Sequence, residues 1–215
     1  MNKYRIKYER NDDARFISHL DLMRTMNRAL RRGGAPLEYT KGFNPHSIMT
    51  VALPLSVGIT SECEYLDITF SKSVDTPSLK DKLNSVMPSG IRVLEIRCAD
   101  EERAFKYIET ARYTVTFTTD TPPDCEAFMA MDEAVVTKRS KSGEKQENIL
   151  PDIHELKSEY VNGLCQIEMH LNAGSKRNLK PELVMSALEQ FQNIGAENIK
   201  IHRSGIYFDD GAEVF

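Results

Sequence analysis

Long apolar runs are absent from this sequence. No stretch approaches the roughly 18 consecutive apolar residues that suggest a membrane-spanning helix. The first residues, MNKYRIKYERNDD, also lack the apolar core of a secretory signal peptide. The 215 residues are 40% hydrophobic and 28% charged, as in an ordinary soluble globular protein. We therefore predict a cytoplasmic protein with either two small domains or one larger one.

Cysteine is scarce, and its spacing matches no metal or cluster motif. The four cysteines lie 35, 27 and 40 residues apart, at Cys63, Cys98, Cys125 and Cys165. No C-x-x-C pair, C-x-x-x-C-x-x-C motif or cysteine–histidine metal spacing occurs. We expect four free thiols in a reducing compartment, and neither a metal site nor a cofactor.

Acidic residues are nearly missing from one basic segment of an otherwise acidic chain. The chain has 28 lysines and arginines against 32 acidic residues, a net charge of −4. The segment 15–46 has six basic residues against Asp21 and Glu38, hence +4, so the rest of the chain sums to −8. These six are Arg15, Arg24, Arg28, Arg31, Arg32 and Lys41. A local basic island of this kind usually binds an anion, and nucleic acid is the first candidate.

The first half of the chain predicts a compact α+β unit. Residues 4–8 alternate as a strand, Ser18 and Asp21 form a capping-box pair, and Gly33-Gly34 end the helix that follows. Leu20, Met23, Met26, Asn27 and Leu30 form one expected stripe of this helix, and the arginines lie on the other. The further expected elements are strands at 48–55, 64–70 and 91–96 and a helix at 77–86. The order β-α-β-β-α-β over residues 1–99 is the ferredoxin-like (split β-α-β) plan, which RNA-recognition modules share.

The second half can be read in the same way. Residues 100–112 are charged and helix-prone, and we expect them to form a connecting segment. Residues 113–215 then predict a second ferredoxin-like unit with longer insertions, including an exposed hairpin tip at 139–148. The expected fold is therefore α+β, with two ferredoxin-like units packed together. The repeat rests on the order of elements only, because the halves share no sequence identity.

Four segments carry a resemblance to a known family: FISHLDLMR, RALRR, EYTKGFNPH and LPLSVGITSECEYLD. They resemble the radical-SAM-linked domain family of unknown function, found in bacteria as a C-terminal domain or separate companion of radical SAM proteins. The resemblance implies an accessory or substrate-recognition role beside a radical SAM enzyme, in RNA modification. The chain has no C-x-x-x-C-x-x-C motif and no radical SAM barrel, so it cannot perform that chemistry alone.

The helix at 18–32 and the GFNPH turn are the main candidate binding residues. Arg24, Arg28 and Arg31 share one helix side with Arg32 beside them, and guanidinium groups match phosphate oxygens. The alternative is a solvated helix face partly paired with Asp21. In the turn, a base could meet the ring of Phe43 and the polar groups of Asn44 and His46, and Lys41 could help the arginines to hold phosphates. The alternative there is a structural loop whose Phe43 fills the core.

Two further groups of residues complete the candidates. His19 and His46 could act as acid and base in metal-free RNA cleavage, although His19 beside Asp21 is equally explained as a hydrogen-bonded structural group. Lys176, Arg177 and Lys180 precede a helix that starts at Pro181, and they form a candidate second phosphate contact.

The sequence therefore predicts an RNA-binding accessory protein that acts with a radical SAM enzyme in tRNA or rRNA modification. We expect the protein itself to be a non-catalytic accessory protein rather than an enzyme. The alternatives are a metal-free endoribonuclease that uses His19 and His46, and a protein–protein adaptor for the radical SAM partner.

Overall fold

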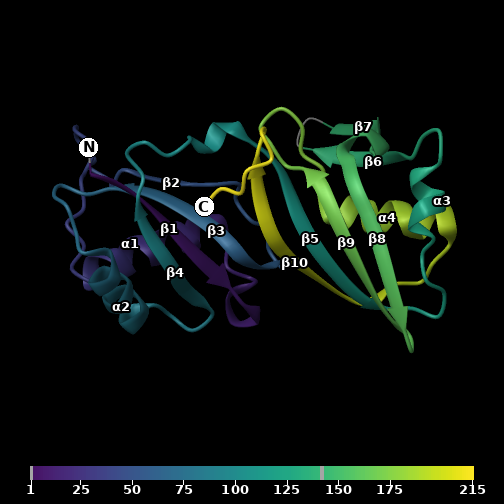
Figure 1. The fold of residues 1–215 in the computed structure, drawn as a ribbon, viewed down its shortest axis with the longest axis horizontal. Helices are drawn as coiled ribbons and strands as arrows, with labels where there is room; N and C mark the ends of the chain where they lie inside the picture. Colours follow the sequence, from purple (N-terminus) through teal and green to yellow (C-terminus); the bar gives the residue numbers. More distant parts are fainter. Residues whose placement is uncertain (1, 141–142) are drawn as a thin grey trace. The chain divides into compact units, whose positions relative to one another are not determined.

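The computed structural model describes residues 2–140 and 143–215 and divides into two compact units (Figure 1). The first contains Met1–Phe105 with Val214–Phe215, and the second contains Lys106–Glu213. The boundary falls inside the charged, helix-prone segment 100–112, which was expected to connect the units and which forms no α-helix. That segment instead contains a 3-10 turn (η2, Phe105–Tyr107) and the start of strand β5 (Ile108–Thr118). Backbone pairing of β5 with two neighbouring strands outweighs the local helix propensity.

The first unit has the expected element order. Its elements are β1 (Lys3–Arg10), η1 (Asp12–Ala14), α1 (His19–Arg32), β2 (Met49–Val51), β3 (Thr60–Thr69), α2 (Thr76–Val86) and β4 (Ile91–Cys98). The strands lie in the order β4-β1-β3-β2, and every neighbouring pair is antiparallel. Ile6 of β1 lies opposite Leu66 of β3 and Ile96 of β4, which places one apolar row across the sheet. This row faces the two helices and forms their common core.

Helix α1 begins at its predicted cap but is rotated relative to the predicted stripe. The Ser18 hydroxyl accepts a hydrogen bond from the Asp21 N–H at 3.2 Å, which confirms Ser18 as the N-cap. Leu22, Met26 and Leu30 enter the core, whereas Leu20 is 67% exposed. The stripe that contained Leu20 was therefore wrong at its first position. Leu22 has the i, i+4, i+8 spacing to Met26 and Leu30 that one helix face requires.

The sheet face that lies opposite the helices in the first unit is covered by the unit's own residues. The Arg5 guanidinium is fully buried and bonds both carboxylate oxygens of Asp67, at 2.7 and 3.1 Å. It also donates to the Val214 carbonyl at 3.0 Å and lies 4.3 Å from the Phe105 ring centroid. Phe215 stacks on Tyr65 with ring centroids 5.6 Å apart. Phe105 and the C-terminal pair, Val214 and Phe215, thus occupy this face.

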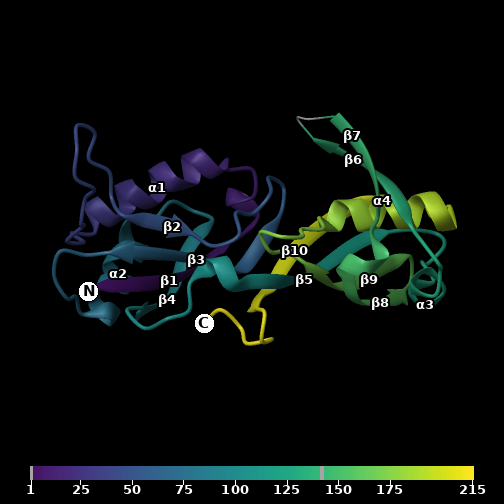
Figure 2. The same ribbon diagram turned by 90° about the horizontal axis from the view of Figure 1, so that it is seen from above.

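The second unit has the same strand order with one insertion. Its elements are β5, α3 (Cys125–Met129), β6 (Val135–Ser140), β7 (Gly143–Asn148), η3 (Leu150–Asp152), β8 (Ile153–Val161), β9 (Leu164–Asn172), α4 (Pro181–Gln192) and β10 (Glu197–Phe208). The sheet order is β10-β5-β9-β8, again antiparallel throughout. Strands β6 and β7 pair with each other and stand away from this sheet (Figure 2). The hairpin tip predicted at 139–148 was too long, because Gly143–Asn148 form β7; residues 141–142 of it lie outside the described residues.

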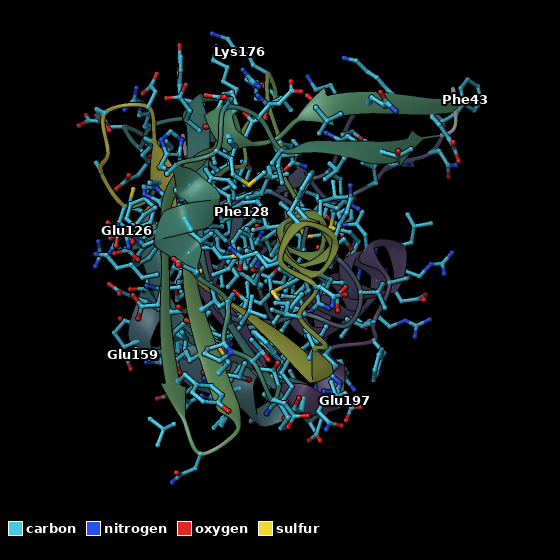
Figure 3. The ribbon with its side chains drawn as sticks, turned by 90° about the vertical axis from the view of Figure 1, so that its right-hand side faces the viewer. Phe43, Glu126, Phe128, Glu159, Lys176 and Glu197 are labelled. Carbon is cyan, nitrogen blue, oxygen red and sulfur yellow. The ribbon has the colours of Figure 1, made fainter. Side chains whose placement is uncertain are left out.

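One face of the second sheet carries the core of that unit. Alternate residues of β9, including Ile167 and Met169, are buried, and α4 supplies Val184 and Leu188. Phe128 of α3 is fully buried, 6.4 Å from the ring of Phe191, and Figure 3 shows it pointing inward. In the part of the chain that the structure describes, no helix is long and apolar enough to cross a membrane.

Candidate functional site

The exposed face of α1 carries the arginines that the sequence singled out. Because Leu22, Met26 and Leu30 face the core, the side chains of Arg24, Arg28, Arg31 and Arg32 all lie on the solvent side. Asp21 is the single acidic residue of this helix. Arg31 and Arg32 occupy the last turn, where the helix dipole favours positive charge. The helix therefore presents a surface of nearly uniform positive charge, which we call the arginine face: Arg24, Arg28, Arg31 and Arg32.

The four arginines differ in how far they are already engaged. Arg24 pairs with Asp21 at 3.0 Å, but both side chains are more than half exposed, so the pair contributes little to stability. The Ser18 hydroxyl, and after it Arg24, hold the pKa of Asp21 below its usual value. Arg32 donates to the Val86 carbonyl at the end of α2, at 2.5 Å. Arg28 makes no hydrogen bond or salt bridge to any described residue, and it is therefore available to an anion.

The GFNPH turn is the tip of a closed loop, residues 40–46. The Thr40 N–H donates to the His46 carbonyl at 2.9 Å, and the His46 N–H donates to the Thr40 hydroxyl at 3.1 Å. Gly42 has φ +133°, a backbone conformation that favours glycine. Phe43 is fully exposed, with a relative accessibility of 110%, and it projects from the surface in Figure 3. The interpretation of Phe43 as a core filler was therefore wrong, because the closed loop base keeps the tip away from the core.

Two contacts join this loop to the arginine face. The Asn27 amide donates to the Ser47 hydroxyl at 2.9 Å, directly after the loop. The Arg31 guanidinium lies 5.7 Å from the ring centroid of Tyr39, directly before it. Loop 40–46 accordingly lies beside the C-terminal end of α1 (Figure 2). The structure thus brings Lys41, Phe43, Asn44 and His46, all exposed, to the same side of the unit as the arginine face.

Sequence reasoning missed the residue that makes this connection. Asn27 lies between the buried and exposed faces of α1, and its polar side chain interrupts an otherwise apolar stripe. A polar residue at the border of a stripe is the signal that marks such a tether. Ser47 is buried, and no local pattern identifies it as the partner, since twenty residues separate the two.

The two candidate catalytic histidines do not form a pair. His19 is exposed at the first position of α1, and eight residues, or about 12 Å of helix, separate it from the loop tether at Asn27. The His46 Nδ1 contacts the Thr40 hydroxyl at 3.2 Å and the Asn44 carbonyl at 3.3 Å. No hydrogen bond or ring contact joins His19 to His46 within residues 2–140 and 143–215. The geometry offers no acid–base pair at this site.

The three residues of the predicted second phosphate contact, Lys176, Arg177 and Lys180, lie in different surroundings. Arg177 is held by the buried Asp152 carboxylate, with Nε–Oδ1 2.6 Å and Nη2–Oδ2 2.9 Å. Lys176 is exposed and points outward in Figure 3. Lys176 and Arg177 line a cavity of about 420 Å³, whereas Lys180, the N-cap residue of α4, does not. The three cations therefore do not converge on one point.

The cysteines are thiols, and a metal site is not evident. Cys63, Cys125 and Cys165 are buried and Cys98 is exposed, and none of these four cysteines forms a disulfide. Burial raises the pKa of Cys125, and it raises the pKa of Cys165 to about 11. Among the described residues, no group of three or more His, Cys, Asp or Glu side chains could hold a metal ion.

Comparison with known proteins assigns the chain to a family. No curated protein matches the chain. A crystal structure of an unknown protein from Galdieria sulphuraria is similar at 13% identity, covering 94% of this chain and 98% of that one, with a TM-score of 0.28. So low a score supports no argument about fold. The model of a family described as "Uncharacterized protein conserved in bacteria (DUF2344)" matches residues 3–181. The match spans most of the chain, and the protein therefore belongs to this family.

Proposed function

We propose that this protein is an RNA-binding accessory protein whose first unit holds RNA between the arginine face and loop 40–46. The observation that carries the proposal is Phe43, a ring fully exposed on a loop that is tethered to a basic helix. An exposed aromatic ring is a stacking platform for an unpaired base, and the surrounding guanidinium groups suit its phosphates. Asn44 and His46 lie in the same loop as Phe43, and their polar groups can form hydrogen bonds with the edge of a base stacked on that ring.

The distribution of surfaces in the first unit supports this side as the binding side. A ferredoxin-like plan, which the order β4-β1-β3-β2 supports, commonly binds RNA on its open sheet face. In this unit Phe105, Val214 and Phe215 occupy that face. The helix side is therefore the surface that remains for a large anionic ligand.

The partner and the cellular context of the proposal come from the sequence motifs. The resemblance to the radical-SAM-linked family supports a radical SAM enzyme as the partner and tRNA or rRNA as the substrate. Four cysteines without a disulfide are in keeping with a cytoplasmic location.

The test is equilibrium binding to labelled tRNA and rRNA fragments over a salt series. For a variant with Arg24, Arg28 and Arg31 all changed to Gln, we expect weaker binding and a plot of log K against log salt that is shallower by about two. For Phe43→Ala we expect a loss of about fivefold to 150-fold in affinity with an unchanged slope, because stacking is worth about 1–3 kcal/mol per base. A triple Gln variant at Lys72, Lys82 and Arg92 removes the same charge elsewhere in the first unit and serves as the control. Equal losses of RNA affinity in both triple variants would show that only the net charge of the protein matters, and not the position of these arginines.

A protein–protein adaptor is the second candidate, favoured by a different observation. Phe16 and Leu20 are each 67% exposed at the N-terminal end of α1. Val57, which directly precedes Gly58, is 56% exposed. The Phe16 ring lies against Gly58, so these apolar side chains surround one end of the helix. A complex with the purified radical SAM partner that persists after nuclease treatment, and that Leu20→Asp abolishes, would favour this function.

A further inference from the structure

The second unit contains a cavity that the RNA-binding proposal does not use. It has a volume of about 420 Å³, within the range of roughly 300–1,000 Å³ typical of small-molecule sites. Its walls come from Lys106 and Tyr107 with the start of β5, from the end of β9 with the loop that follows, and from Asp209 just after β10. All of these segments belong to the second unit.

Backbone contacts hold the walls of this cavity in place. The Ala173 N–H donates to the Glu109 carbonyl at 2.8 Å, and the Asp209 N–H donates to the Tyr107 carbonyl at 3.1 Å. Gly174 approaches so closely that a Cβ there would lie 2.7 Å from the Ile108 carbonyl oxygen. A cavity whose walls are joined in this way is preorganised, so a ligand does not need to order it on binding.

The loop after β9 is also anchored through side chains. The buried Asp152 carboxylate binds Arg177 at two points and accepts a further hydrogen bond from the Asn172 amide at 2.6 Å. Lys138 of β6 donates to the Asn178 carbonyl at 3.1 Å. Because Asp152 already binds Arg177, the cations of this cavity that are left for a ligand are Lys106 and Lys176.

The lining chemistry is divided between groups that suit a phosphate and groups that suit a base. Ser175 and Lys176 supply a hydroxyl and an ammonium group from the loop. Tyr107 offers a ring that is 44% exposed, with the Lys106 ammonium 4.9 Å from its centroid. Glu109 and Asp209 are acceptors, which repel phosphate but match the amino groups on the edge of a base. A ligand with an anionic end and an aromatic, amine-bearing end satisfies both sets.

We propose that this cavity binds a nucleoside monophosphate unit, either free or at the end of an RNA strand. Its phosphate lies toward Ser175 and Lys176, its base stacks on Tyr107, and the base edge donates to Asp209 or Glu109. GMP, AMP and CMP, which carry an exocyclic amino group, are expected to bind more tightly than UMP. The site contains no residue of the arginine face, and its occupation does not depend on those arginines.

The test is calorimetric titration of the full chain with GMP, AMP, CMP and UMP, with guanosine and inorganic phosphate as partial ligands. We expect saturable binding of GMP, at least tenfold weaker binding of guanosine and of phosphate, and losses of about tenfold in Lys176→Gln and in Tyr107→Ala. Lys200→Gln is the matched control, since Lys200 is exposed on β10 nine residues, or about 30 Å, from Asp209. Thermal unfolding of each variant identifies any loss that comes from misfolding.

The outcomes separate the sources of the ligand and the two proposals. A short RNA with a terminal phosphate that binds with the same dependence on Lys176 would assign the cavity to an RNA end. Binding of mononucleotides alone would assign it to a free nucleotide. The variant that lacks Arg24, Arg28 and Arg31 should keep GMP binding in either case. No saturation by any mononucleotide at millimolar concentration, or unchanged GMP affinity in Lys176→Gln, would overturn the assignment.

Discussion

At the scale of single residues, burial decides which side chains are available for chemistry. Cys98 is exposed, whereas Cys63, Cys125 and Cys165 lie inside the two units. The same distinction separates Phe43, whose ring meets water on all sides, from Phe128, whose ring is fully buried. A sequence assigns both phenylalanines the same apolar character, so only their surroundings tell a core residue from a candidate binding residue.

Thiol labelling should therefore modify one cysteine of the native protein. Thiolates are the reactive form, and burial both blocks access and, with a pKa of about 11 for Cys165, keeps that thiol protonated at neutral pH. We expect one maleimide per molecule at pH 7.5, lost in Cys98→Ser, and four after denaturation. Mass spectrometry measures both. Rapid labelling of Cys125 or Cys165 in the native state would contradict the buried placement.

His170 should make the protein less stable as the pH falls. Burial, with help from Arg112 and His154, lowers the pKa of His170 below the usual 6.5, against an opposing effect of Glu155. Below pH 6.5 the unfolded chain binds a proton at this histidine more readily than the folded chain does. The free energy of unfolding therefore decreases as the pH is lowered. Urea unfolding between pH 7.5 and 5 should show this decline, and His170→Gln should reduce it. A free energy of unfolding that increases from pH 7.5 to pH 5 in the wild type would contradict a lowered pKa of His170.

At the scale of elements, turns and tethers position α1 more than helix propensity does. The chain enters α1 through η1, where the Asn11 N–H donates to the Gly90 carbonyl at 3.0 Å. Arg10 is buried and reaches the carbonyl oxygens of Ala14 and Arg15, at 3.4 and 3.2 Å. These contacts set where the helix starts, and so which of its side chains face the solvent.

Gly90→Ala should disturb this entry strongly. Gly90 has φ +90°, and a Cβ there would lie 2.6 Å from the Ala14 backbone nitrogen. Strain and overlap together are expected to cost about 2–4 kcal/mol in the free energy of unfolding. Gly34→Ala is the matched control, because Gly34 has φ +73° with no atom within 4 Å, and it should cost only about 1 kcal/mol. Chemical denaturation of both variants gives the comparison, and similar costs would mean that the close approach is unimportant.

At the scale of the whole molecule, the end of the chain completes the unit in which the chain begins. Val214 and Phe215 belong to the first unit, although the preceding hundred or so residues form the second. Val214 is 1% exposed, its carbonyl accepts from the buried Arg5, and the Phe215 ring lies 4.1 Å from the Arg97 guanidinium. The covered face of the first sheet, which directs our functional proposal to the helix side, depends on these two residues.

Removal of Val214 and Phe215 should therefore destabilise the first unit. The deletion exposes apolar surface and leaves one Arg5 donor without its carbonyl, for an expected loss of about 3 kcal/mol. Hydrogen exchange measured by mass spectrometry should show faster exchange in β1 and β3, with unchanged rates in β9 and α4. Uniform protection throughout the truncated chain would show that the C-terminal pair contributes little.

Local chemistry allowed much of the fold to be predicted. Ser18 as a cap, the end of α1 at Gly33, the alternation in β1 and β9, and Pro181 at the start of α4 all involve groups close together in the chain. The hairpin β6–β7 was not predicted at its full length, because β7 (GEKQEN) has no apolar residue and therefore shows no strand alternation. Strand β5 begins inside the segment 100–112, which was expected only to connect the two units, because β5 is stabilised by neighbours distant in sequence.

By itself the sequence determined the α+β character, the order of the elements in the first unit and the basic island, because period, capping and charge are properties of neighbouring residues. Only the tertiary structure decided that Leu20 and Phe43 are exposed, that Asn27 ties the loop to α1, and that Arg177 belongs to Asp152. It also brought Lys106, Tyr107, Lys176 and Asp209 around one cavity. Each of these facts joins residues far apart in the chain, and such pairings exist only once the packed core has placed the elements that carry them.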